Sequence, residues 1–195
     1  MYLTKEVIIL IEKTKVGVVD WETLKADLNA LPKETLVEMV SMWIQNYWVC
    51  QNYWVSFVEN EIGVDATIRL DGEVFKRAVK VQGKKLKELL NLGDDMFTLA
   101  FVLKHTAPQW TPAGFRWEFL EVSEERIRMC VRSCPMGDYR KSHNLEVFPC
   151  KELAMPLYNN LAQSVNPKIK ATCVHAHPDA PKEDLMCQWE FTYEN

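Results

Sequence analysis

The spacing of apolar residues changes from a helical to an alternating pattern near Gly114, and that change constrains the fold more than any other feature. Before residue 105, apolar side chains recur every three or four residues, which is typical of helices. Over residues 115–119 and 126–132 they alternate with charged residues, which predicts an antiparallel hairpin with one buried face. The intervening segment 106–114 is broken by prolines and predicts a linker.

The second half continues with a helix and another hairpin. A helical pattern covers about residues 151–165, and alternating patterns return at 169–173 and 185–193. The order of elements is therefore β-β-α-β-β. We predict an α+β fold in which a helical half, residues 1–105, packs on an antiparallel sheet unit, residues 114–195, within a single domain.

Capping residues and breakers divide the first half into helices. Asp20 is suited to cap a helix that begins at Trp21, and Pro32 is tolerated in the first turn of the long helix that follows. Gly63 ends this long helix, and the next one is expected to begin at Asp71 or Gly72. The predicted helices cover residues 3–15, a short segment from 21, about 33–60, a segment from 71 or 72 to Gly93, and a short segment from Asp94 or Asp95 to about Lys104.

The predicted helix at about 33–60 is the most apolar of these segments. Its apolar residues form two stripes, so most of its circumference is apolar and we expect it to lie buried at the centre of the domain. Its aromatic side chains either pack in the core or form one wall of a pocket for an apolar or aromatic small molecule, opposite a sheet face that contains Trp117. A guanidinium such as that of Arg140 can bind a carboxylate group. The candidate ligand-binding residues are Trp43, Tyr47, Trp54, Trp117 and Arg140.

Charge and composition exclude several classes of function. The net charge of −4 argues against nucleic-acid binding, which requires a basic surface. No targeting segment and no stretch of membrane-spanning length is visible, so we expect a cytoplasmic protein without a membrane partner. In that compartment, the six cysteines favour metal binding or buried thiols over a disulfide framework.

Four cysteines stand at the edges of predicted elements in the last third of the chain. Cys134 follows a strand and precedes a proline, and Cys150 opens the predicted helix of the second half. Cys173 and Cys187 lie on the strands of the second hairpin, and symmetric closure at Ala180 would make them face each other with Cβ atoms about 5 Å apart. We predict that these four thiols converge on one centre.

The chemistry of that centre has several interpretations. Four thiolates can hold tetrahedral zinc or an iron–sulfur cluster, with His177 as a further or substitute ligand. The same cysteines can instead be buried structural thiols, or a disulfide or redox pair. A cysteine beside a base, such as Cys173 near His175, can act as a nucleophile. Cys50, on the apolar helix, and Cys130, on the outer side of a strand, are expected to stay outside the centre.

The motifs around these cysteines resemble two known groups of proteins. The stretch CKELAMPLYNNLAQSVNPKIKATCVHAHPDAPKEDLMCQWEF, residues 150–191, is similar to the hydrocarbon-binding 4-vinyl-reductase domain. CPMGDYR, NLEVFPCK, NPKIKATC and the earlier YWVSFVENEIGVDATIRLDGEVFKR resemble anaerobe proteins related to L-2-amino-thiazoline-4-carboxylate hydrolases. The resemblance covers most of residues 45–195. It implies the ligand-binding fold shared with Golgi-transport subunits, an apolar pocket, a cysteine site and a homodimer.

Two hypotheses of function follow. The first is a small-molecule-binding protein, in which a cysteine-held zinc ion or iron–sulfur cluster lies beside an aromatic-lined pocket. The alternative is an enzyme, a small-molecule hydrolase or lyase that uses the metal or a thiolate. A closed shell of four cysteines favours binding, because a catalytic zinc ion keeps one coordination position open. In both cases the expected assembly is a homodimer, because the helical half carries more apolar surface than a small sheet can cover.

Overall fold

The chain adopts an α+β fold, which confirms the class predicted from the change in apolar spacing. The computed structural model describes Lys5, residues 20–106 and residues 111–194. The helix predicted over residues 3–15 therefore lies outside the described residues, apart from Lys5. The helices are α2 (Trp21–Asn29), α3 (Lys33–Ile62), α4 (Val64–Leu90), α5 (Met96–Thr106), α6 (Pro135–Ser142) and α7 (Cys150–Val165), and the strands are β1 (Arg116–Val122), β2 (Arg126–Ser133), β3 (Ile169–His175) and β4 (Cys187–Tyr193).

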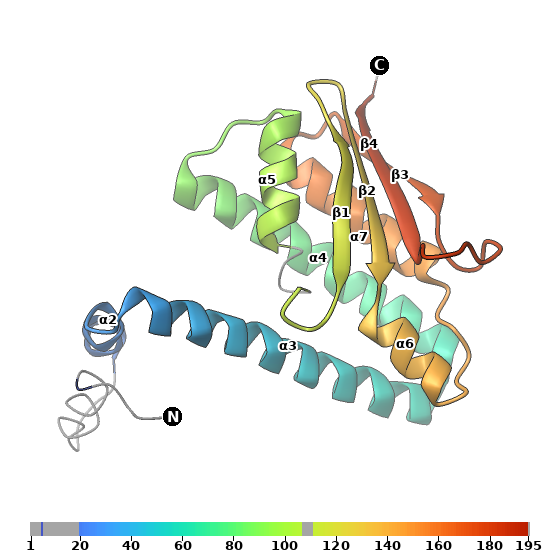
Figure 1. Cartoon of the computed structure of the whole chain (residues 1–195), viewed down its shortest axis with the longest axis horizontal. Helices are drawn as coiled ribbons and strands as arrows, with labels where there is room; N and C mark the ends of the chain where they lie inside the picture. Colours follow the sequence, from blue (N-terminus) through green and yellow to red (C-terminus); the bar gives the residue numbers. More distant parts are fainter. Residues whose placement is uncertain (1–4, 6–19, 107–110, 195) are drawn as a thin grey trace.

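The four strands form one antiparallel sheet in the order β1-β2-β4-β3, so the two predicted hairpins lie side by side (Figure 1). Alternation along the strands decides which side chains face inward. Met129 of β2 pairs with Trp189 of β4, and both are fully buried in the core that α5 and α7 share with the sheet. On the outer face, the next pair along the same strands is Arg128 and Glu190, which form an ion pair at 3.6 Å.

The second hairpin does not close at the predicted residue. Cys173 pairs with Trp189, which centres the hairpin on residue 181, midway between 173 and 189, instead of Ala180. A bulge just beyond Cys173 shifts the register again, and Cys187 pairs with the neighbouring strand β2. The prediction that Cys173 and Cys187 face each other is therefore wrong, because a shift of one residue gives every side chain a different partner.

The long helices α3 and α4 meet at Gly63 without a loop between them. Gly63 has a φ of +84°, a conformation that glycine adopts readily, and it follows the last residue of α3 and precedes the first residue of α4. The predicted start of this helix at Asp71 or Gly72 is wrong, since α4 begins at Val64 and both residues lie buried inside it. A single glycine therefore suffices as the junction, and residues 64–70, which the prediction left between the two helices, form the first turns of α4.

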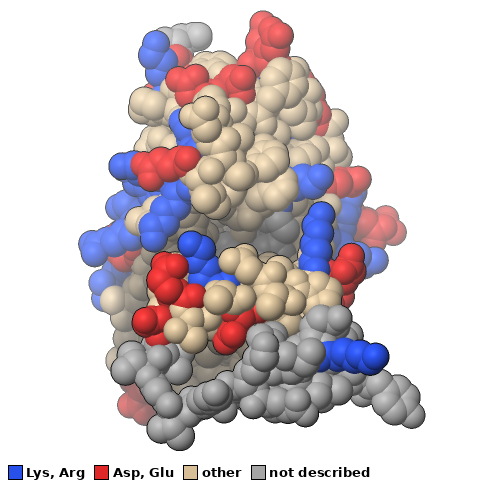
Figure 2. Space-filling model, turned by 90° about the vertical axis from the view of Figure 1, so that its left-hand side faces the viewer, with Lys and Arg blue, Asp and Glu red and all other residues tan. Residues whose placement is uncertain are grey.

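The aromatic helix α3 is not the centre of the fold. Trp48 and Val55 are buried, whereas Trp43 is 64% exposed and Phe57 is 67% exposed. Figure 1 shows α3 along one side of the molecule, with its first half extending away from the sheet toward α2. Figure 2, viewed from that end, shows uncharged side chains over the middle of the face and charged ones at its margins. The prediction of a buried central helix is wrong, because α3 contacts the body through a narrow stripe.

Despite the apolar character of α3, no helix in the described part of the chain is long and apolar enough to span a membrane.

Helix α4 lies against α7 through two glycines about three turns apart. A Cβ atom added at Gly83 would lie 2.0 Å from the Oγ and 3.0 Å from the Cβ of Ser164 on α7. At Gly72 the nearest atom would be Leu153 Cδ1 at 3.8 Å, which is an ordinary contact. The close approach of the two helices therefore requires a glycine at position 83 but not at position 72.

Alanine substitutions at these two glycines are expected to have opposite effects on stability. Gly83→Ala should lower the free energy of unfolding by about 1–3 kcal/mol, because the Cβ of Ser164 is fixed to the α7 backbone and cannot rotate away. Gly72→Ala should raise it by about 0.5–1 kcal/mol, because alanine favours the helix. Urea unfolding measures both, and a Gly83→Ala protein as stable as the wild type would contradict the close approach.

Candidate functional site

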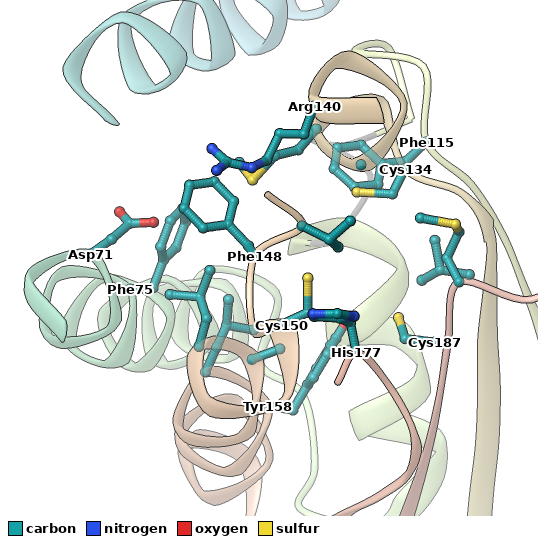
Figure 3. Close-up of a pocket in the computed structure, with 18 of the residues that line it drawn as sticks. Asp71, Phe75, Phe115, Cys134, Arg140, Phe148, Cys150, Tyr158, His177 and Cys187 are labelled. Atoms are coloured by element: carbon teal, nitrogen blue, oxygen red, sulfur yellow. The ribbon is translucent and has the colours of Figure 1, made fainter. Parts of the chain in front are cut away.

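A cavity of about 140 Å³ lies where α3, α4, α6 and α7 meet the inner ends of β2 and β4 (Figure 3). Its wall is mainly apolar and includes six aromatic side chains. Trp48 of α3 stacks on Phe75 of α4 with ring centroids 6.3 Å apart, and its ring lies 5.5 Å from that of Phe115. A second pair, Tyr158 and Trp189, has ring centroids 4.7 Å apart. The cavity therefore offers flat apolar surfaces that come from α3, α4, α7, β4 and the residue that precedes β1.

Three of the predicted cysteines, Cys134, Cys150 and Cys187, also line this cavity. They stand at the ends of elements: Cys134 precedes α6, Cys150 is the first residue of α7, and Cys187 is the first residue of β4. Burial raises the pKa of Cys134, raises that of Cys150 to about 11 and raises that of Cys187 to about 12. All three are thus protonated at neutral pH and act as small apolar side chains.

The described residues do not contain the predicted four-cysteine metal centre. No group of three or more His, Cys, Asp or Glu side chains among them is placed to hold a metal ion. Cys173 lies outside the cavity wall, where burial raises its pKa and nearby Lys151 partly offsets this effect. His177, the predicted substitute ligand, does line the cavity. The register of the second hairpin pairs Cys173 with Trp189 and Cys187 with Val131, so these two thiols are not cross-strand partners.

The two cysteines that were expected to stay outside this group do so for different reasons. Cys50 is exposed on α3, so the expectation that it is buried is wrong. Cys130 points to the outer face of the sheet, as expected, but it is fully buried there. Its Sγ lies 3.6 Å from Glu118 Oε1.

A polar cluster lies at the end of β3, close to Cys173. Lys151 Nζ is 3.0 Å from Asp179 Oδ1, and the backbone N–H of Ala176 donates to the same carboxylate at 3.2 Å. The buried ring of His175 has its Nδ1 3.9 Å from Asp179 Oδ2. This cluster fixes the loop that follows β3, and the nucleophilic role suggested for Cys173 stays a prediction.

Arg140 is a buried cation at one end of the cavity, with 4% of its surface exposed. Its two terminal nitrogens donate to the carboxylate of Glu59 on α3 at 2.7 and 2.9 Å, and its Nε donates to the carbonyl of Glu146. The guanidinium carbon lies 3.9 Å above the ring centre of Phe148. Glu59 therefore neutralises the charge and anchors the end of α3 on α6.

A second hollow, of about 800 Å³, lies between α3 and α6 and adjoins the cavity. Met136, Arg140 and Phe148 line both spaces. These three side chains are held by the ion pair to Glu59 and by packing against Val55. A small molecule that reaches the cavity from this groove must pass them.

Asp71 is the second charged residue in the cavity wall. It lies inside α4, 3% exposed, and its Oδ1 accepts a hydrogen bond from Gln51 Nε2 of α3 at 2.6 Å. Burial raises its pKa to about 6, against an opposing effect of this hydrogen bond. The nearby carboxylate also helps to raise the pKa of Tyr47, for which burial is the main cause.

Of the predicted ligand-binding residues, the structure places Arg140 in the cavity wall and the other four outside it. Trp43, Tyr47 and Trp54 are exposed on α3, and Trp117 packs on Phe119 with ring centroids 5.1 Å apart. The residues of α3 that face the body differ from the predicted ones. They form another stripe, which consists of Trp48, Gln51, Val55 and Glu59.

The sequence contained a signal for this stripe that the apolar pattern hides. The spacings of three, four and four residues place these side chains on one helix face. Two of them, Gln51 and Glu59, are polar, so a search for apolar periodicity passes over them. Asp71 was predicted to begin a helix, although a carboxylate in the interior of an amphipathic helix is a candidate functional group.

The fold and the cavity define an α+β protein in which helices cover one face of a four-stranded antiparallel sheet and enclose an aromatic-lined space beside it. The chain belongs to DUF6125, a family of unknown function, whose match spans residues 29–193.

The structure is also similar to the crystal structure of the phenol-responsive sensory domain of the transcription activator PoxR with phenol. The TM-score is 0.52 at 10% sequence identity, and the similarity covers 74% of this chain and 73% of that chain. At this identity it shows a shared fold. A comparison with curated proteins finds no match. None of these findings names a 4-vinyl reductase or a thiazoline carboxylate hydrolase, so those resemblances stay predictions.

We expect Asp71→Asn to stabilise the protein at pH 7. A carboxyl group whose pKa rises from 3.8 to about 6 on folding favours the folded state below pH 4, and this contribution is lost as the pH rises through 6. Removing the charge should therefore raise the free energy of unfolding at pH 7 by roughly 3 kcal/mol and have little effect at pH 4. Among the titratable groups that remain in the variant, Tyr47 interacts electrostatically with Asp71, and the same cavity wall contains Cys134, Arg140, Cys150, Tyr158, His177 and Cys187.

Urea unfolding of both proteins between pH 4 and pH 7.5 measures the difference. Asp65→Asn, at an exposed position in the first turn of the same helix, is the matched control and should not show this pH dependence. A variant less stable than the wild type at pH 7 would show that the Asp71 carboxylate is stabilising where it lies.

Proposed function

We propose that the protein binds small aromatic molecules of about one ring in the cavity between α3 and the sheet. The observation that carries the proposal is an apolar space walled by aromatic rings from separate elements. Its volume of about 140 Å³ is close to that of an engineered apolar cavity of about 150 Å³ that binds benzene. The fold shared with a sensory domain whose structure contains phenol supports the same class of ligand.

Binding accounts for the thiols better than catalysis does. A cysteine nucleophile acts as the thiolate, and burial raises the pKa of each cavity thiol. Protonated thiols add to the apolar wall instead. The proposed role is therefore that of a receptor or sensor of a small molecule, in place of the alternative hydrolase or lyase.

Filling the cavity should abolish binding. Ala154 of α7 lies in the wall, and a phenylalanine at this position places a ring in the space that the ligand would occupy. We expect isothermal titration calorimetry to detect phenol binding to the wild type. Ala154→Phe should weaken this binding at least about 10-fold, because the ligand would lose the contacts with the cavity wall that bury most of its surface.

Ala26→Phe, an exposed alanine on α2, is the control and should bind as the wild type does. Urea unfolding shows whether each variant is folded. Wild-type protein that binds neither phenol nor a related single-ring compound at millimolar concentration, or a folded Ala154→Phe variant with unchanged affinity, would refute the proposal.

The proposed assembly is a homodimer that pairs through α3. The large exposed apolar side chains of this helix include Val40, Trp43, Tyr53 and Phe57, and a second copy of the same helix is a partner of matching chemistry. Light scattering at micromolar concentration should give twice the chain mass of 22.7 kDa. Trp43→Glu with Phe57→Glu should give the monomer mass, and a wild-type protein that is already monomeric would contradict the assembly.

A further inference from the structure

We propose that Asp71 determines the specificity of the cavity by accepting a hydrogen bond from a hydroxyl or amino group on the aromatic ligand. This inference rests on the proposed function and narrows it, because it selects single-ring compounds that carry a hydrogen-bond donor over isosteric compounds that lack one. Figure 3 shows the Asp71 carboxyl group at one end of the cavity, beside the rings of Phe75 and Phe148.

Of the two charged residues in the cavity wall, Asp71 is the one that can accept a hydrogen bond from a ligand. Arg140 is engaged with Glu59 through both terminal nitrogens and with the Glu146 carbonyl through Nε. In contrast, no ion pair in the described part of the chain involves Asp71, and its hydrogen-bond partner Gln51 is neutral. A carboxylate has two oxygens that together accept several hydrogen bonds, so the bond from Gln51 leaves capacity for a donor on a ligand.

The helix position of Asp71 explains why this carboxyl group lies at the cavity. Phe75, one turn further along α4, is on the same helix face and forms part of the aromatic wall. A ring that stacks among Trp48, Phe75 and Phe115 therefore has a carboxylate beside its edge. Aromatic rings supply most of such a site's affinity, and a few placed polar groups supply its orientation and selectivity.

Burial of this group is costly, which supports a role in function. An uncompensated carboxylate in an apolar space destabilises the folded chain, and the raised pKa of Asp71 has the same origin. An apolar residue at this position would remove that cost. Groups that reduce stability in a cavity wall are candidates for binding.

A competing source of selectivity is the indole of Trp189. Its N–H is buried and lies close enough to the Cys187 thiol to lower the pKa of that thiol by hydrogen bonding, against the larger effect of burial. This N–H is a donor, so it would favour ligands with an acceptor oxygen. Asp71 favours ligands with a donor, and the two can be separated with suitable compounds.

The experiment is titration calorimetry of the full chain with phenol, toluene and anisole. Phenol and toluene have nearly the same shape but differ in the donor, and anisole has the oxygen without the donor. We expect the wild type to bind phenol at least about 10-fold more tightly than toluene or anisole, the range for one hydrogen bond to a charged group. Asp71→Leu should reduce this preference to within about twofold.

Asp71→Asn is the second variant, because it keeps the shape of the side chain and a bond to Gln51, and it should reduce the preference about fivefold. Asp65→Asn is the control and should keep the wild-type preference.

Equal binding of phenol and toluene by the wild type would overturn the role of Asp71 while leaving the proposed function intact. Anisole that binds as tightly as phenol, or a phenol preference that persists in folded Asp71→Leu, would assign selectivity to another group such as Trp189. Absence of binding by all three compounds would overturn both proposals.

Discussion

The close packing of α4 on α7 is the contact on which the rest of the structure depends. Gly83 lets the two helices approach, and this approach sets the distance between the α4 face that carries Asp71 and Phe75 and the start of α7 that carries Cys150. Because α7 also packs on the inner face of the sheet, the helix pair fixes the cavity relative to Trp189. A chain with wider spacing between these helices would have the same elements but a different cavity.

Helix α3 closes the cavity through a stripe that alternates packing and polar contacts. Trp48 and Val55 fill two core clusters, and Gln51 and Glu59 bond to residues of α4 and α6. The polar contacts have defined donors and acceptors, so they fix the rotation of the helix, which apolar packing alone specifies loosely. The same contacts connect both charged residues of the cavity to α3. A ligand that touches Asp71 or Arg140 therefore acts directly on the helix that carries the exposed aromatic surface.

Local patterns in the sequence were sufficient to predict most of the elements and insufficient to predict the site. The cap at Asp20, whose carboxylate accepts from the Thr23 N–H at 2.9 Å, and the alternation in β1 and β2 are properties of a few neighbouring residues. The register of β3 on β4 depends on where the intervening loop closes. The loop is centred one residue beyond Ala180, so the cross-strand partner of Cys173 is Trp189 and not Cys187. The buried face of α3 depends on what α4 and α6 present to it, and no property of α3 alone distinguishes Trp48 from Trp43.

The same four cysteines can have different chemical roles, depending on small differences in their geometry. Sequence position alone allows a metal centre, a redox pair or apolar packing, because each requires cysteines at converging ends of elements. Three of the four do converge, but they face a space bounded by Tyr158 and Trp189, where burial keeps them protonated. A metal would have to displace their protons at a cost set by those raised pKa values, and the same burial favours an uncharged ring. The charged group in that space that forms no ion pair among the described residues is the Asp71 carboxylate, which accepts a hydrogen bond from Gln51, and the proposed selectivity for ligands rests on it.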